Sequence, residues 1–299
     1  MRREQMRFGD LFAGVVGPVL SFEVFPPRSD EAARQLDRVL PRLAALKPHY
    51  ITVTYGAFGG TRDRTLEIAR RVKDEFGLES ACHLTCVGLR RSELDGMLAD
   101  IRAAGIDNIV ALRGDPPEGS VEFGSAPDCY RHANELVEHI RRYEQRRGIE
   151  PFGIAVAGYP EKHIEAPDME SDLLNLKRKV GAGAELVITQ LFFDNRHYFR
   201  FVERARALGI EVPIVPGLMP IASAKQIERF TRMCGATVPV ELRRRLEEAG
   251  EQKDRARAIG TEHCLRQAIE LLEWGAPGLH FFVLNRSRQI EQILAQLPL

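Results

Sequence analysis

Glu23 is an ionisable residue in an apolar setting, which suits it to proton transfer. It lies within the apolar run at residues 19–25, flanked by Phe22 and Val24. Burial disfavours the charged form of a carboxyl group and raises its pKa, so Glu23 is predicted to be a general acid that is protonated near neutral pH. A structural glutamate paired with a buried arginine is the alternative.

A second carboxylate, Asp115, lies shortly after the apolar run at residues 108–112. It is preceded by Arg113 and Gly114 and followed by two prolines, which stop any continuation of the strand. Charged residues at the carboxyl end of a buried strand are typical of active sites in parallel α/β folds. Taken alone, this segment is equally well interpreted as a polar transition from strand to loop.

His83 raises the question of a metal site, because Cys82 and Cys86 are close to it in the sequence. Side chains alternate along a strand, so the two cysteines are predicted on one face, and His83 with Thr85 on the other. Ligands on opposite faces cannot converge, and no metal is expected here. A histidine that is simply part of the core is the alternative for His83.

A polar stripe marks the helix predicted after the fifth strand. Asp172, Asn175 and Lys179 recur at helical spacing, with Arg178 adjacent. A carboxylate, an amide and two cations in line could hold ribose hydroxyls and a diphosphate. An exposed helix face with salt bridges is the alternative.

Eight strand-like runs alternate with helical patterns, which predicts a (β/α)₈ TIM barrel in a single domain with extra helices. Strands are expected at residues 19–25, 50–55, 80–87, 108–112, 152–159, 185–193, 213–218 and 279–284. Helices are expected at 30–46, 62–76, 92–104, 127–147, 168–181, 195–208, from Ser223 onward, and at 239–249, 254–273 and 286–296, after a short one near the start. A doubly wound sheet is less favoured because no G-x-G-x-x-G follows the first strand.

In such a barrel the active site lies at the carboxyl ends of the strands. Strands covered by helices are otherwise uniformly apolar, yet these ends carry polar groups, and a functional site is expected there. The groups are Glu23, Thr54, His83 with Thr85, Arg113 with Asp115, Tyr159 with Glu161 and His163, Gln190 with Asp194, and Asn285 with Arg286.

Charge and cysteine content narrow the class of protein. The 42 basic residues equal the 42 acidic ones, so the basic excess of a nucleic-acid or membrane binder is absent. Five scattered cysteines in 299 residues do not form a disulfide framework. We expect a cytoplasmic protein with reduced thiols, without nucleic-acid or membrane partners, and a homo-oligomer.

Nine segments together resemble the methylenetetrahydrofolate reductase family over nearly the whole chain. They are residues 21–27 (SFEVFPP), 53–56 (VTYG), 83–85 (HLT), 111–115 (ALRGD), 159–163 (YPEKH), 172–179 (DLLNLKRK), 188–194 (ITQLFFD), 216–220 (PGLMP) and 284–286 (LNR). The resemblance implies a TIM barrel that holds FAD and reduces 5,10-methylenetetrahydrofolate to 5-methyltetrahydrofolate with NAD(P)H. It also implies a ping-pong mechanism and a product that supplies methyl groups for methionine synthesis.

The same resemblance implies roles for individual residues. Glu23 matches the general acid that opens the methylene bridge, and Asp115 matches a carboxylate near the flavin and the pterin. FAD contacts are implied for Thr54, His83, Leu112, Arg113, Gly114, Asp115, Tyr159, His163, Asp172, Asn175, Arg178 and Lys179. Substrate contacts are implied for Glu23, Thr54, Asp115, Gln190, Phe230 and Arg286.

Two other classes of protein are compatible with the residues. A metal-dependent lyase or aldolase could use Glu23, His83 and Asp115 as ligands, and an inactive barrel could serve as a scaffold, which would need neither carboxylate. The loops at 56–60 and 222–225 are less typical of the family. Since the sequence stops after the last barrel helix, we expect no regulatory module and no inhibition by adenosylmethionine.

Overall fold

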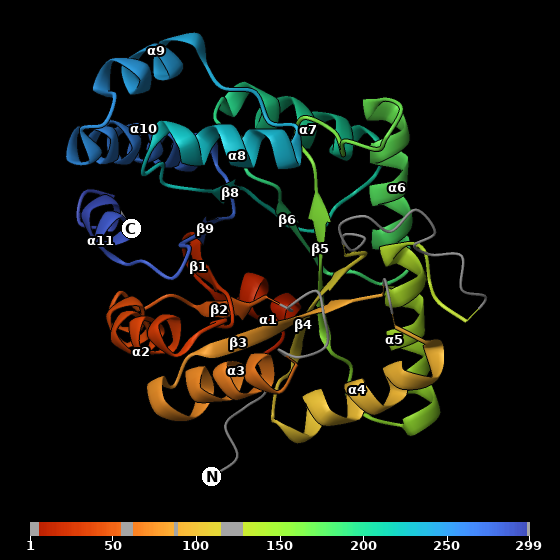
Figure 1. Ribbon diagram of the computed structural model, residues 1–299. Coiled ribbons are helices and arrows are strands. Elements are labelled where there is room, and N and C mark those ends of the chain that lie inside the picture. Colours follow the sequence, from red (N-terminus) through yellow and green to blue (C-terminus); the bar gives the residue numbers. More distant parts are fainter. Residues whose placement is uncertain (1–5, 55–61, 87–88, 115–127, 298–299) are drawn as a thin grey trace.

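The computed structural model describes residues 6–54, 62–86, 89–114 and 128–297. Its strands form a ring of parallel strands with helices packed around the outside (Figure 1). The strands are β1 (Val19–Val24), β2 (Tyr50–Val53), β3 (Glu79–Thr85), β4 (Asn108–Leu112), β5 (Gly153–Gly158), β6 (Leu186–Thr189), β7 (Ile214–Val215), β8 (Gly217–Leu218) and β9 (Gly278–Phe282). The predicted TIM barrel is confirmed.

The ring closes through one short stretch of chain that Pro216 divides into β7 and β8. β7 pairs with β6 and β8 pairs with β9, all in parallel, so this stretch supplies the eighth wall. Pro216 has no N–H, but its carbonyl accepts a hydrogen bond from the His280 N–H at 3.0 Å. A side chain at Gly217 would lie 2.2 Å from the Thr189 carbonyl oxygen, so the closure requires glycine.

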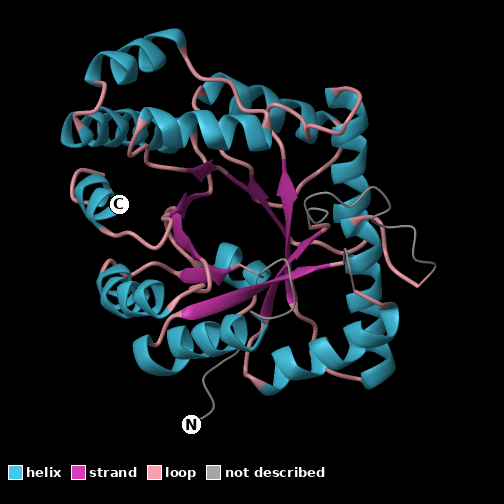
Figure 2. Cartoon of the chain, viewed as in Figure 1, coloured by secondary structure: helices cyan, strands magenta, loops and turns pink. Residues whose placement is uncertain are grey.

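The outer layer consists of helices that alternate with the strands, with two additional helices before the last strand (Figure 2). They are α2 (Asp30–Ala45), α3 (Arg62–Phe76), α4 (Arg91–Ala103), α5 (Ala133–Arg147), α6 (Met169–Gly181), α7 (Asn195–Ala207), α8 (Ala224–Cys234), α9 (Val240–Ala249), α10 (Lys253–Trp274) and α11 (Arg288–Leu294). As predicted, Ser223 caps α8, with its Oγ accepting from the Gln226 N–H at 3.1 Å. None of the helices in the described part of the chain has the length and apolarity to cross a membrane.

The sixth strand ends earlier than predicted, at Thr189 instead of residue 193. Phe192 and Phe193 continue the apolar run but leave the sheet and are buried under the helices that follow. The Phe192 ring stacks on Tyr198 with centroids 5.7 Å apart, and its carbonyl accepts from the Gln267 side chain at 3.2 Å. An apolar run therefore need not be strand throughout when helices cover its second half.

The amino-terminal helix α1 (Phe8–Gly14) closes one end of the barrel. Phe8 and Leu11 are buried against interior residues, and the Phe8 ring meets Tyr50 edge-on at 5.1 Å. The Asn108 side chain accepts from the Phe8 N–H at 2.9 Å and donates to the Met6 carbonyl at 2.9 Å. The amino ends of the strands are thus sealed, which leaves the carboxyl ends for ligands.

Candidate active site

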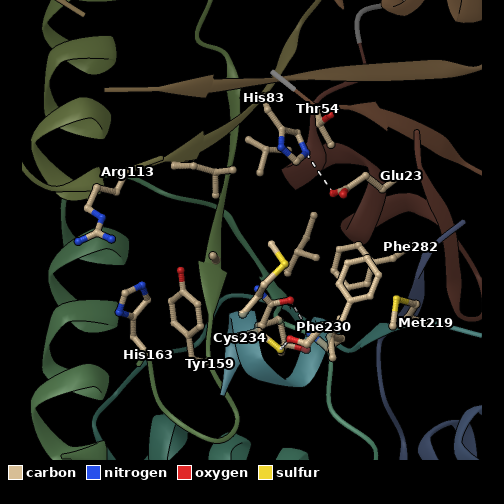
Figure 3. A pocket seen from close by; sticks show the side chains of 18 of the residues that line it. Glu23, Thr54, His83, Arg113, Tyr159, His163, Met219, Phe230, Cys234 and Phe282 are labelled. Atoms are coloured by element: carbon tan, nitrogen blue, oxygen red, sulfur yellow. Dashed lines mark hydrogen bonds and ion pairs between the residues drawn. The ribbon is translucent and has the colours of Figure 1, made fainter. Parts of the chain in front are cut away.

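A cavity of about 370 Å³ opens at the carboxyl ends of the strands. Its walls come from β1 to β6, the end of β8, β9 and helix α8. They are formed by Glu23, Phe25, Thr54, His83, Val110, Leu112, Arg113, Gly114, Ala157, Tyr159, His163, Ile164, Glu165, Ile188, Thr189, Gln190, Leu191, Met219, Phe230, Met233, Cys234, Phe282 and Leu284. Figure 3 shows Glu23 and His83 on one side of this cavity and Arg113, Tyr159 and His163 on another.

Glu23 lies between two buried histidines. Its Oε2 is 3.3 Å from the Nε2 atom of His83 and 3.7 Å from the Nε2 atom of His280. The Glu23 side chain keeps 20% of its exposure, whereas His280 is fully buried. The alternative of a buried arginine partner is wrong, because the partners are imidazoles.

The expected protonation of Glu23 is also wrong. Burial raises the pKa of the Glu23 carboxyl, but the electrostatic interaction with the nearby His83 and His280 imidazoles outweighs it and brings the pKa to about 2. Glu23 is therefore a carboxylate at neutral pH. The proton that it could deliver has to be supplied by a neighbouring group.

The two imidazoles have unused hydrogen-bonding capacity. Neither the His83 Nε2 nor the His280 Nε2 has a hydrogen-bond partner within the described residues, and both are buried. The other ring nitrogen of His280 is 2.9 Å from the Ser21 hydroxyl, which orients the ring. Buried polar atoms are normally paired, so this cluster is built for something other than stability.

The opposite wall carries positive charge and aromatic rings. Arg113 pairs with Glu165 through both guanidinium nitrogens, one of them 2.8 Å from Oε1. Tyr159 meets His163 edge-on at 4.8 Å. Gly114 has a φ of +87°, and a side chain there would lie 3.0 Å from the Thr85 Cβ. Glycine is thus required where the chain turns out of β4, just before Asp115, which lies outside the described residues.

The polar stripe of α6 divides into an inner and an outer pair. Asp172 is buried and accepts from the His163 N–H at 3.1 Å; Lys179 donates to the Ala157 carbonyl at 2.5 Å. Burial lowers the pKa of Lys179 to about 8, and the charge of Asp172 partly offsets this shift. Burial also raises the pKa of Asp172. Asn175 and Arg178 are exposed and bond to each other at 2.8 Å. Neither pair lines the cavity, but the inner pair adjoins its wall.

Four residues implied for substrate binding have different positions. Gln190 and Phe230 line the cavity, and Thr54 does so from the end of β2. Arg286 is exposed and does not line the cavity, although Leu284, two residues earlier, does. Phe230 could equally have been a core residue of its helix on pattern alone.

Sequence reasoning missed His280 and Glu165. His280 alternates with Phe282 in the last strand, so the period of two places both on the inner face. That signal was available but is weak for one histidine between aromatic residues. Glu165 lies in a loop, where no periodicity indicates which side chain meets Arg113.

No group of three or more metal-ligating side chains occurs among the residues that the structure describes. Cys82 and Cys86 are buried in the outer core, on the face opposite His83, as the alternation predicts. All five cysteines are free. The lyase alternative is not favoured by any of these observations.

A closed parallel α/β barrel whose ionisable groups meet in an open cavity at the carboxyl ends of its strands is the arrangement of barrel enzymes. Comparison with known proteins is more specific. A model of the methylenetetrahydrofolate reductase family matches residues 14–298, and the chain belongs to this family.

Several relatives support the assignment. The chain is 40% identical over 268 residues to 5,10-methylenetetrahydrofolate reductase of Escherichia coli, covering 90% of this chain and 86% of that one. It is 39% identical to methylenetetrahydrofolate reductase (NADH) 1 of Arabidopsis thaliana, covering 93% of this chain and 48% of the relative. The chain thus spans about half the length of the plant relatives it matches.

A solved structure has the same fold. It is an uncharacterised protein from Clostridium thermocellum that binds two copies of 5-methyl-5,6,7,8-tetrahydrofolic acid. The TM-score is 0.64 at 15% identity, with 95% of each chain covered.

Proposed function

We propose that this protein is a flavin-dependent reductase that converts 5,10-methylenetetrahydrofolate to 5-methyltetrahydrofolate, with FAD as bound cofactor and NAD(P)H as hydride donor. The observation that carries the proposal is the Glu23–His83–His280 cluster beside an open cavity, in a chain of this family. This reduction requires a proton donor and a surface against which planar rings can pack.

The residues around the cavity are chemically suited to FAD. Val110, Leu112, Ala157 and Ile188 supply apolar wall for a flat ring system. On the adjoining side, the Lys179 amine donates to one carbonyl at 2.5 Å, which leaves donors for a diphosphate. The chemistry that FAD supplies when bound is hydride transfer, from nicotinamide and then to folate.

Further cofactor contacts follow from the same wall. Arg113 and His163 would lie along the diphosphate side, and Tyr159 would pack against the ring system. Asp172, Asn175 and Arg178 would hold ribose and diphosphate at the outer end. These assignments match the pattern of the family.

Glu23 would move the proton that opens the methylene bridge. Ring opening leaves an iminium on the folate, which can accept hydride, and protonation of the departing nitrogen assists it. His83 and His280 flank the Glu23 carboxylate, with ring nitrogens 3.3 Å and 3.7 Å from its Oε2, and would exchange the proton with it. Folate that excludes water from the carboxylate raises its pKa and favours transfer through it.

Substrate selection would depend on the remaining wall. Gln190 would hydrogen-bond the pterin, and its Oε1 accepts from the neighbouring Leu191 N–H at 2.9 Å. Phe230 would pack against nicotinamide and folate in turn, which is compatible with ping-pong kinetics because both occupy one opening. Asp115 would lie between flavin and pterin, and Asp115→Asn should weaken folate turnover and shift the flavin potential.

The test is stopped-flow spectroscopy of the purified protein. We expect a yellow protein whose flavin absorbance bleaches with NADH, NADPH or both, and returns when methylenetetrahydrofolate is added. A colourless protein that takes up no FAD would contradict the proposal. So would a flavin that nicotinamide reduces but folate does not reoxidise.

A further inference from the structure

Glu161 is one of the polar groups predicted at the carboxyl ends of the strands, and it does not line the cavity. It lies in the loop between β5 and α6, and only 9% of its side chain is exposed. A carboxyl group removed from water to this extent needs hydrogen-bond donors from the protein. Its partners come from two other parts of the chain, so Glu161 joins three segments.

Thr237, in the loop between α8 and α9, supplies most of these contacts. Its main-chain N–H donates to Glu161 Oε1 at 3.1 Å and to Oε2 at 3.0 Å, and its hydroxyl donates to Oε2 at 2.6 Å. The Nε2 atom of His197, on α7, lies 3.4 Å from the same oxygen. Hydrogen bonds to a carboxylate are stronger than those between neutral groups. We call the bonds between Glu161 and Thr237 the Glu161 anchor.

A second contact joins the same two loops. Gly235 follows α8 directly and has a φ of +74°, a conformation that favours glycine. A side chain there would also lie 2.8 Å from the Cγ2 atom of Ile164, which belongs to the loop after β5 and lines the cavity. The carboxyl end of α8 is therefore held against that loop by close packing at Gly235 and by the Glu161 anchor.

Helix α8 depends on such attachments because its own packing is slight. Of its eleven residues, only Ile227 is buried. The helix nevertheless carries Phe230, Met233 and Cys234, which form part of the cavity wall (Figure 3). Most of the stability of a helix in a protein comes from the packing of its apolar face. The position of these three side chains therefore depends on how the ends of α8 are held.

We propose that Glu161 is a positioning residue, which through Thr237 holds α8 so that Phe230 faces the ligands in the cavity. This inference rests on the proposed function, in which nicotinamide and folate pack against Phe230 in turn. Glu161 touches neither ligand and acts only through the helix. Loss of the Glu161 anchor should raise the ligand concentrations needed for half-saturation and leave the maximum rates nearly unchanged, because a contact made equally in the ground and transition states affects binding alone.

The first measurement follows α8 itself, by hydrogen–deuterium exchange of the full chain without added ligand. In Glu161→Ala, the amides of residues 224–234 should exchange about tenfold faster, because the helix opens more readily once its end is released. Thr237→Val keeps the main-chain donor and removes only the hydroxyl, so it should accelerate exchange less, by about threefold. The amides of α3 and α4 should exchange as in the parent.

The second measurement is stopped-flow reduction and reoxidation of the FAD-loaded protein over a range of ligand concentrations. In Glu161→Ala, the half-saturating concentrations of NAD(P)H and of methylenetetrahydrofolate should rise about five- to tenfold, with maximum rates within about twofold of the parent. Glu291→Ala is the matched control, because Glu291 pairs with Arg42 through two bonds of 2.8 and 2.6 Å that join α11 to α2. Neither residue lines the cavity. The control should change neither the half-saturating concentrations nor the exchange of α8.

Three results would overturn the inference and leave the proposed function intact. The first is unchanged exchange of α8 in Glu161→Ala. The second is faster exchange with unchanged half-saturating concentrations, which would make the Glu161 anchor a purely structural contact. The third is a loss of maximum rate that exceeds the change in half-saturating concentration, which would place Glu161 in the chemistry itself. A parent protein that binds no FAD or does not reduce the folate would overturn the proposed function and the inference with it.

Discussion

Asn108 at the amino end of the barrel and the two imidazoles at its carboxyl end differ in how fully their side chains are hydrogen-bonded. At the amino end, Asn108 is buried and uses both its amide oxygen and its amide nitrogen, to the Phe8 N–H and the Met6 carbonyl. At the carboxyl end, His83 and His280 are buried with an Nε2 atom that has no hydrogen-bond partner among the described residues. Both sites lie inside one ring of strands, yet Asn108 is paired through both side-chain atoms and the two imidazoles are not.

This difference separates stabilising polar residues from reactive ones. A fully satisfied buried amide orders the structure, and its loss leaves partners unpaired. A carboxylate and imidazole cluster with unused hydrogen-bonding capacity remains free to exchange protons with a ligand. We therefore assign the amino end to folding and the carboxyl end to chemistry. The following expected outcomes test this division.

The largest effect is expected at the sealed end. Asn108→Leu leaves the Phe8 N–H and the Met6 carbonyl without partners, which should lower the free energy of unfolding by about 2–4 kcal/mol. Urea unfolding measures the change. The flavin half-reactions of the folded variant should be unaffected; a stable variant with impaired hydride transfer would break the comparison.

At the open end, His280→Leu should act on chemistry more than on folding. It removes an imidazole 3.7 Å from the Glu23 carboxylate with which Glu23 can exchange the proton, so the folate half-reaction should slow by about 10- to 100-fold, less than for a general acid itself. His139→Gln is the control, since His139 is buried outside the barrel and bonded to Tyr130 and Asp95. The control should lose stability and keep its rate; the reverse pattern would contradict the division.

Cofactor binding should depend on the inner pair of α6. Lys179→Met should weaken FAD binding about tenfold, as expected for one charged hydrogen bond. Lys177→Met on the exposed face of the same helix should change it little. Titration of FAD fluorescence compares the two variants, and equal losses would argue against Lys179 as a diphosphate ligand.

The smallest effect is a change in acid stability. The pKa of Glu23 is about 2 in the folded protein against an ordinary value of 4.5, so its contribution is complete above about pH 4.5 and is lost as pH falls toward 2. Glu23→Gln should flatten the stability profile in this window by about 1 kcal/mol per pH unit at most. Unfolding free energies measured from pH 5 to pH 2 would show it, and parallel profiles would rule it out.

The barrel could be predicted from the sequence because its signal is repeated. Alternating runs specified the strands, and the end of β4 at Leu112 agrees with the prediction. Tertiary packing accounts for the exceptions. The run through Phe193 changes from strand to buried loop because α10 covers it, and the pattern of the run does not show that a helix about 60 to 80 residues later packs on it.

The site could be predicted only in part. Position at a strand end correctly placed Glu23, His83 and Arg113 at the cavity, but it did not separate them from rim residues with structural roles. Asn285, for example, is buried and bonds to both backbone groups of Phe25. The predicted protonation of Glu23 was wrong because the carboxylate lies beside His83 and also beside His280, which is more than 250 residues away in sequence. Residue type and position in a strand do not indicate which residues, far apart in the sequence, lie next to each other in the fold.

The central claim is that Glu23, together with His83 and His280, transfers the proton in the folate half-reaction and takes no part in flavin reduction by NAD(P)H. Stopped-flow spectroscopy of Glu23→Gln, loaded with FAD, tests it directly. We expect flavin reduction by NAD(P)H to stay within about twofold of the parent, while reoxidation by methylenetetrahydrofolate slows by about 10²–10⁴-fold. Equal slowing of both half-reactions, or normal reoxidation by folate, would contradict the account.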